Sequence, residues 1–212
     1  GIPEAIWTDE AKVNLENVEG LRTQEEETRQ AKKQDHHEEA FFLEFKTKPY
    51  DHQKKAFFIS RDLPAIGWFM EMGTGQTKWA IDNAAKLYAT GEIDTMLIIA
   101  PNGVHKQWIS EQVPVHMPDW ITHRGISYVS AMGKKKREEM EDILAEGNSL
   151  KIIAMNIEAL SSKKGVDFCQ RILMSNRCMI VIDERSRIKS PTAKRTNAFT
   201  KLVEMAPYRR IM

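Results

Sequence analysis

Short apolar runs alternate with amphipathic stretches along the chain from Phe45 onward. The apolar runs predict strands, because parallel strands that are covered on both faces of a sheet carry few polar positions. They span residues 65–70, 96–100, 126–129, 152–155 and 179–182. Helical spacing of apolar positions predicts helices at 78–88, 136–144, 165–174 and 193–204, with a further helix around Trp108 and Ile109. The alternation predicts an α/β fold, with a mostly parallel, doubly wound sheet flanked by helices and ligands at the carboxyl ends of the strands.

Residues 1–44 follow a different pattern. Residues 9–40 are dense in charge and carry few apolar anchors, which is typical of a solvated helix or a disordered arm. We therefore divide the chain into a charged N-terminal extension, residues 1–44, and a folded unit, residues 45–212. A protein partner that binds the extension is one hypothesis for its role.

The overall composition excludes some classes of protein and favours none strongly. The chain has 31 basic and 30 acidic residues, so nucleic acid would have to be bound by a local patch rather than by a global field. No apolar run approaches the roughly 20 residues that span a bilayer. Cys169 and Cys178 lack metal-ligand spacing, and we expect both to be reduced in a cytoplasmic protein.

Residues 71–77 read Glu-Met-Gly-Thr-Gly-Gln-Thr and resemble a phosphate-binding loop that opens a helix. Backbone N–H groups of such a loop cradle phosphates, a Lys reaches the β- and γ-phosphates, and a Thr hydroxyl holds Mg²⁺. Gln76 stands where the Lys is expected, and it retains a donor but no charge. Lys78 does not replace it, because two helical positions rotate a side chain by about 200°. We expect weak nucleotide binding and little or no hydrolysis.

A second motif follows the predicted strand 179–182. Asp183 and Glu184 stand at its carboxyl end, where an Asp binds Mg²⁺ and a neighbouring acid activates water in ATP hydrolases. An Asp-Glu pair alone is common on protein surfaces. Downstream of a Gly-Thr-Gly-x-Thr loop, the pair predicts a metal site formed by Thr77 and Asp183, with Glu184 as the catalytic acid.

With these motifs in this order, residues 45–212 resemble the first RecA-like domain of a superfamily-2 helicase or translocase, a P-loop NTPase. The likeness is greatest to SWI/SNF-like ATPases of phage and bacterial type, and places the chain in a bacterial or phage-infected cytoplasm. Pro49-Tyr50-Asp51-His52-Gln53 resembles the adenine-recognition segment. Residues 183–190 resemble the Asp-Glu (DEAD/DEAH-like) box, and residues 208–212 resemble the strand that leads into motif III.

The resemblance implies ATP and Mg²⁺ as cofactors, DNA (duplex rather than single-stranded) as a partner, and a second RecA-like lobe that supplies arginine fingers. The implied nucleotide-binding residues are Tyr50, Gln53, Met72, Gly73, Thr74, Gly75, Gln76 and Thr77. The implied nucleic-acid-binding residues are Pro101, Asn102, Gly103, His105, Lys106, Asn156, Arg187 and Lys189. Trp108 is expected to pack in the core. The basic run at 134–137 is expected to be a solvated helix start, with DNA contact as the alternative.

The chain departs from the family pattern at Gln76 and at Arg185, and it ends at Met212, before motif III and the second lobe. We therefore expect no detectable hydrolysis by this polypeptide alone. Three hypotheses remain open: the ATP-binding lobe of a DNA-dependent ATPase or translocase, a natural pseudo-ATPase that binds DNA or protein, and a nucleotide-independent interaction domain. The presence of Thr77, Asp183 and Glu184 favours the first.

Overall fold

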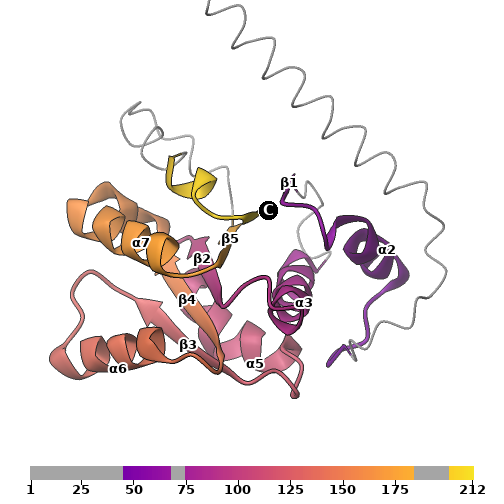
Figure 1. Ribbon diagram of the computed structural model, residues 1–212, viewed down its shortest axis with the longest axis horizontal. Helices are drawn as coiled ribbons and strands as arrows, with labels where there is room; N and C mark the ends of the chain where they lie inside the picture. The colour runs from indigo at the N-terminus through magenta and orange to yellow at the C-terminus, as the bar shows by residue number, and fades with distance from the viewer. Residues whose placement is uncertain (1–44, 68–74, 184–200) are drawn as a thin grey trace, which may run out of the picture.

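A single six-stranded parallel sheet forms the centre of the computed structural model, which describes residues 45–67, 75–183 and 201–212 (Figure 1). Its strands are β1 (Ala65–Gly67), β2 (Thr95–Ala100), β3 (His123–Tyr128), β4 (Leu150–Asn156), β5 (Cys178–Ile182) and β6 (Tyr208–Ile211). The order across the sheet is β1-β6-β5-β2-β4-β3, and every neighbouring pair is parallel. The predicted α/β class and the parallel sheet are confirmed.

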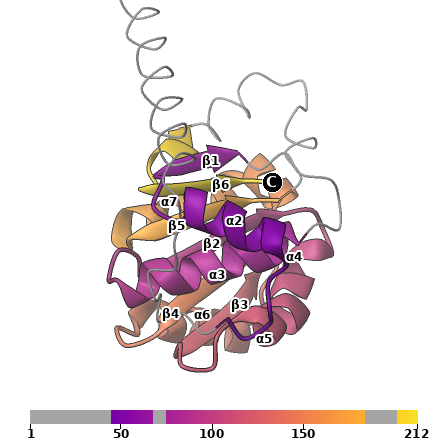
Figure 2. The same ribbon diagram turned by 90° about the vertical axis from the view of Figure 1, so that its right-hand side faces the viewer.

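Helices cover both faces of this sheet (Figures 1 and 2). One face carries α2 (Asp51–Ser60), α3 (Gln76–Ala89), α4 (Val104–Gln107), a π-helix (Trp108–Gln112) and α5 (Val113–His116). The other face carries α6 (Lys134–Ala145) and α7 (Lys163–Ser175), and a 3₁₀-helix (Ile157–Ser161) precedes α7. Parallel strands need such crossover connections, so the parallel pairing is what the alternation in the sequence predicts.

The central strands supply two separate cores because their side chains alternate between faces. In β2, Met96 and Ile98 pack with α3, whereas Leu97 and Ile99 pack with the α6 and α7 face. All four side chains are completely buried. Burial on both faces is the physical reason for the uninterrupted apolar runs that identified these strands.

Two local features differ from the expectations. The strand predicted over residues 65–70 is β1, which is partly exposed because it lies at the edge of the sheet; residues 68–70 are outside the described ranges. Helix α2 was not predicted from periodicity. Its buried residues are Gln53, Phe57 and Ser60, so two of the three are polar and the apolar stripe is lost.

Strand β6 contributes a completely buried arginine. The Nε of Arg210 donates a hydrogen bond to Asn83 Oδ1 of α3 (2.7 Å), and one terminal nitrogen donates to the carbonyl oxygen of Pro64 (3.3 Å). Burial lowers the pKa of Arg210 to about 9. This side chain joins β6, α3 and the segment before β1 in the interior.

The part of the chain just before α2 packs against α5 and the loop that follows it. Lys46 forms an ion pair with Asp119 (2.6 Å), and Thr47 Oγ1 forms a hydrogen bond with His116 Nδ1 (2.8 Å). In addition, the Phe45 ring makes an edge contact with Phe57 of α2 (5.4 Å between centroids). Residues 1–44 lie outside the described ranges, so the predicted extension stays a prediction. Across the described ranges, no helix combines the length and apolar character needed to traverse a bilayer.

Candidate functional site

Helix α3 has its amino terminus at the carboxyl end of the sheet. The residue that precedes it, Gly75, is one that no other residue replaces easily. Gly75 has φ +90°, a left-handed conformation that side chains disfavour. A Cβ at this position would stand 2.0 Å from Gln53 Nε2. The Gln53 amide therefore lies directly against the turn that opens α3, and the end of the predicted phosphate loop meets the predicted adenine-recognition residue.

Gln53 is held in place by the start of α2. Its Oε1 accepts a hydrogen bond from the backbone N–H of Tyr50 (3.0 Å), as an N3 glutamine does when it caps a helix. Gln53 is buried, whereas the Tyr50 ring is 70% exposed and stacks on His52 with planes 10° apart. An exposed aromatic ring beside a fixed amide is suited to stacking on a planar base and reading its edge.

Gln76 and Thr77 occupy the first turn of α3 and are half-buried. Lys78, the next residue, is buried and pairs with Asp82 one turn further along (2.5 Å), while its ammonium lies 4.9 Å from the centre of the Phe45 ring. Burial raises the pKa of Asp82 to about 6, against the opposing effect of Lys78. Lys78, the lysine nearest in sequence to position 76, is thus held by an ion pair and an aromatic ring.

Asp183 directly follows β5, and both its backbone and its side chain contact neighbouring elements. Its backbone N–H donates to Ile99 O of β2 (2.9 Å), and its Oδ2 accepts a hydrogen bond from the indole Nε1 of Trp108 (2.9 Å). The carboxylate is half-buried, whereas Trp108 is 1% exposed. The burial of Trp108 agrees with the expectation of a core residue; its bond to Asp183 is an additional role that the sequence did not indicate.

Several predicted site residues lie outside the described ranges: Met72, Gly73, Thr74, Glu184, Arg187 and Lys189. The described part of the site consists of Tyr50, Gln53, Gly75, Gln76, Thr77 and Asp183. It contains the hydroxyl and the carboxylate expected to hold Mg²⁺ and the helix start expected to face phosphates, so the residues present fit Mg²⁺ and a nucleotide. Nowhere in the described ranges does a cluster of three or more His, Cys, Asp or Glu residues offer an alternative metal centre.

The loops after β2 and β4 carry the predicted nucleic-acid contacts. Asn102, Gly103 and Lys106 are exposed, and Gly103 (φ +88°) begins α4. Pro101 is buried, and its carbonyl oxygen accepts a hydrogen bond from the backbone N–H of His105 (3.2 Å). Asn156 is half-buried, and its side chain accepts a hydrogen bond from the Ala159 N–H (2.9 Å).

The structure corrects the expectation for His105. Its side chain has no exposed surface, and neither ring nitrogen has a hydrogen-bond partner. Burial lowers the pKa of His105, which favours the neutral imidazole. A buried neutral ring does not contact a phosphate backbone, so Lys106 is the better candidate on this helix.

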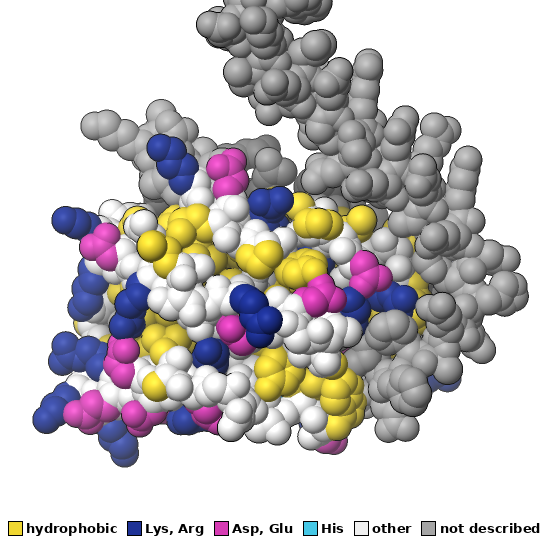
Figure 3. Space-filling model, in the orientation of Figure 1, with side chains coloured by type: hydrophobic (Ala, Val, Ile, Leu, Met, Phe, Trp, Pro, Cys, Tyr) yellow, Lys and Arg dark blue, Asp and Glu magenta, His cyan; other side chains and the backbone are white. Residues whose placement is uncertain are grey.

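Charges of both signs are interleaved over the α6 and α7 side of the molecule (Figure 3). Lys134 begins α6 and lies 3.8 Å from Glu138, as expected for a solvated helix start. A pocket of about 280 Å³ lies between these helices and the end of β3, and two of the cations that line it are engaged: Arg171 pairs with Glu141, and Lys164 donates to Ser130 O. The pairing of Lys134 favours the solvated helix start, and contact of the run 134–137 with DNA stays the alternative.

Cys169 and Cys178 are buried free thiols on the α7 side of the sheet. Burial raises the pKa of each to about 12. Both are free, as expected of reduced residues, and thiols of such high pKa react poorly at neutral pH.

Comparison with known proteins supports the fold and leaves the family open. A scan against protein-family models finds no match, and a search of curated protein sequences finds no similar protein. Among solved structures, the chain is similar to the UvsW helicase from bacteriophage T4, with a TM-score of 0.50 and 12% sequence identity. The match covers 78% of this chain and 52% of that protein, so the chain spans about half the length of the helicase. The fold is therefore that of a helicase-like RecA domain.

Proposed function

We propose that this chain is the ATP-binding lobe of a DNA-dependent ATPase or translocase of the SWI/SNF-like superfamily-2 type, in which Gln76 suppresses turnover. The observation that carries the proposal is the convergence of two predicted motifs at one end of the sheet. Gly75, held against the Gln53 amide, opens α3, and Asp183 ends β5, against which α3 packs. The proposal is supported by the general rule that open α/β sheets bind their ligands outside the carboxyl ends of the strands.

In the proposed site, Tyr50 and Gln53 bind the base, and the start of α3 binds the phosphates. Thr77 and Asp183 hold Mg²⁺, which supplies charge neutralisation on the phosphate oxygens. Glu184, outside the described ranges, activates water. Gln76 offers an amide where an ammonium is needed, and loss of a charge-assisted phosphate contact costs about 1.5 to 3 kcal/mol.

DNA binds, in this proposal, across the loops that follow β2 and β4. The exposed Asn102, Gly103 and Lys106 support this, because backbone N–H groups, amides and lysines are the usual phosphate contacts. The cytoplasm of a bacterium or of a phage-infected host is the compartment proposed for such a protein. A pseudo-ATPase that binds nucleotide or DNA without turnover is the second candidate, and Gln76 is the observation that favours it.

Restoring the lysine tests the proposal. Gln76→Lys is expected to tighten Mg·ATP binding by about ten- to a hundredfold in titration calorimetry, the range that corresponds to the regained contact. Gln170→Lys adds the same charge at an exposed position of α7 and is expected to leave binding unchanged. If Gln76→Lys binds Mg·ATP no better than the unmodified chain, the ATP-binding lobe is the wrong assignment.

A further inference from the structure

The bond between Trp108 and Asp183 joins the two halves of the site. The two residues are 75 positions apart in sequence, and Nε1 lies 2.9 Å from Oδ2. Trp108 follows α4, and Asn102, Gly103 and Lys106, in and just before that helix, are exposed at the proposed DNA-facing edge. Asp183 belongs to the proposed metal site. A single buried side chain therefore contacts the carboxylate from the element that would bind DNA.

The backbone around Trp108 is adapted to this contact. Residues Trp108–Gln112 form a π-helix, and the Val113 N–H bonds to Trp108 O five residues back. Pro114 follows and has no N–H, so it cannot complete an α-helical bond to the carbonyl of Ser110. π-Helical turns are rare and occur most often at functional sites. The widened turn distinguishes this segment from an ordinary core helix.

We propose that Trp108 is a positioning residue for the metal-binding carboxylate: its indole N–H occupies Oδ2 of Asp183 and thereby orients the group toward Mg²⁺. The inference rests on the proposed function, because it assigns Trp108 a part in the same site. An indole is a donor only and does not titrate, so it fixes an acceptor in one orientation at all working pH values. Hydrogen bonds that orient metal ligands typically contribute ten- to a hundredfold in metal affinity.

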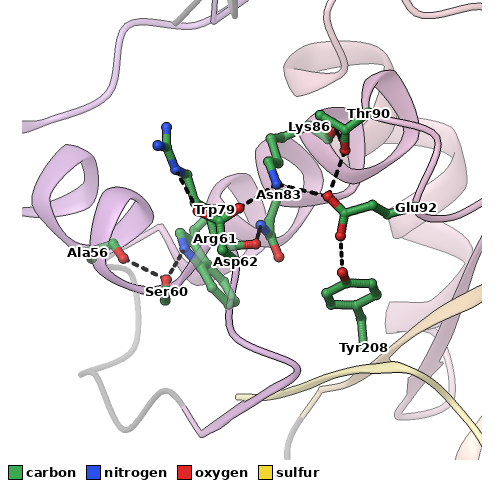
Figure 4. A network of polar contacts seen from close by, with 10 residues as sticks. All are labelled: Ala56, Ser60, Arg61, Asp62, Trp79, Asn83, Lys86, Thr90, Glu92 and Tyr208. Carbon is green, nitrogen blue, oxygen red and sulfur yellow. Dashed lines mark hydrogen bonds and ion pairs between the residues drawn. The ribbon is translucent and has the colours of Figure 1, made fainter. Parts of the chain in front are cut away.

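A purely architectural role for Trp108 makes a different prediction, and Trp79 provides the matched control. Trp79 is 2% exposed, packs in the same core, and donates its indole N–H to Ser60 Oγ (3.1 Å), as Figure 4 shows. Trp→Phe removes the donor and keeps an aromatic ring in either position. Both changes lower the melting temperature, but only the change at Trp108 removes a bond to Asp183.

The Mg²⁺ dependence of fluorescent ADP binding separates these roles in the Gln76→Lys chain. Trp108→Phe is expected to raise the Mg²⁺ concentration at half-saturation by about tenfold, while ADP affinity in EDTA stays unchanged. Trp79→Phe is expected to leave both values unchanged. In an Asp183→Asn background, Trp108→Phe is expected to have no further effect, since residues that act through one another are not additive.

Each possible outcome either supports or overturns the positioning role of Trp108. If Trp108→Phe leaves the Mg²⁺ midpoint unchanged, or shifts it no more than Trp79→Phe does, the inference is overturned. ADP binding by the Gln76→Lys chain would in that case still support the proposed function. If that chain binds no nucleotide, the proposed function fails and the inference with it. Should Trp108→Phe not fold, the ¹⁵N-indole spectrum of the Gln76→Lys chain replaces it. Addition of Mg²⁺ to the ADP complex must then move the Trp108 signal more than the Trp79 signal, and equal shifts overturn the inference.

Discussion

The two ends of the sheet use polar residues in opposite ways. At the amino end, Lys86 pairs with both Asp62 and Glu92, and Tyr208 donates to Glu92, so four segments are joined in one network (Figure 4). At the carboxyl end, Gly75 and Gly103 precede helices and have positive φ angles, and Asp183 is held at the edge of the core. Polar groups at the amino end satisfy one another, whereas those at the carboxyl end are positioned next to loops and helix starts.

This difference agrees with the proposal that ligands bind at the carboxyl end, while the paired groups at the amino end contribute to stability. The amino-end carboxylates are paired with cations: although burial opposes it, Lys86 and Arg61 hold the pKa of Asp62 below its usual value. Asp94 is similarly placed between Lys151 (4.0 Å) and Arg177 (3.7 Å). Carboxylates and cations that are already paired in this way have few hydrogen-bonding positions left for a ligand. Substitutions there should change folding, and substitutions at the carboxyl end should change binding.

The largest effect is expected at a pair of glycines, one from each end. Gly75→Ala places a Cβ against Gln53 in a left-handed backbone, so we expect it to abolish nucleotide binding by the Gln76→Lys chain. Gly91→Ala, after α3 at the amino end, has the same unfavourable backbone (φ +73°) but meets nothing within 4 Å. It should cost about 1 kcal/mol of stability and leave binding unchanged. Calorimetry and urea unfolding of both variants measure this, and equal losses of binding would remove the distinction between the ends.

Asp82 and Asp62, which both pair with lysines of α3, should respond oppositely to pH. The folded-state pKa of Asp82, about 6, exceeds the unfolded value of 3.8, so the folded chain binds more protons between about pH 4 and 6. Its contribution to stability therefore falls as pH rises through that window. The lowered pKa of Asp62 instead contributes stability at neutral pH, which is lost in acid, below the window of Asp82.

Asp82→Asn should remove the first of these effects. Relative to the unmodified chain, the variant is expected to gain about 2 kcal/mol in free energy of unfolding between pH 4.5 and pH 7, since each pKa unit corresponds to about 1.4 kcal/mol. Asp142→Asn, at an exposed position of α6, serves as the control and should show no such gain. Urea unfolding at the two pH values measures the difference. A pH-independent difference would show that the Lys78–Asp82 pair is ionised throughout.

The sequence predicted the parts of this molecule that depend on local patterns. β2, β4 and β5 are buried on both faces, so their apolar runs were unambiguous. Helix α2 was not predicted, because the polar residues Gln53 and Ser60 lie on its buried face. Their burial follows from contacts with Gly75 and Trp79, which are distant in sequence.

Prediction of the candidate site is limited in the same way, because contacts between residues distant in sequence leave no local pattern. Gly75 and Asp183 could be named from the sequence because the motifs that contain them are defined by residue types at fixed spacing. The bond from Trp108 to Asp183 was not, because it depends on how α4 and its π-helix pack on the sheet. The burial of His105 beside the exposed Lys106 has the same origin. A proline four residues after Ser110 was the one available signal of an irregular turn.

The smallest effect is expected where the carboxyl end would meet DNA. Lys106 is exposed on α4 beside Asn102 and Gly103, so Lys106→Ala should weaken duplex binding several-fold and reduce the salt slope of the affinity by about 1, as loss of one phosphate contact does. Lys134→Ala removes an equally exposed lysine that pairs with Glu138 on α6. We expect it to leave the slope unchanged. Fluorescence anisotropy with a labelled duplex between 50 and 200 mM salt measures both, and a larger effect at Lys134 would relocate the DNA contact from the strand ends to α6.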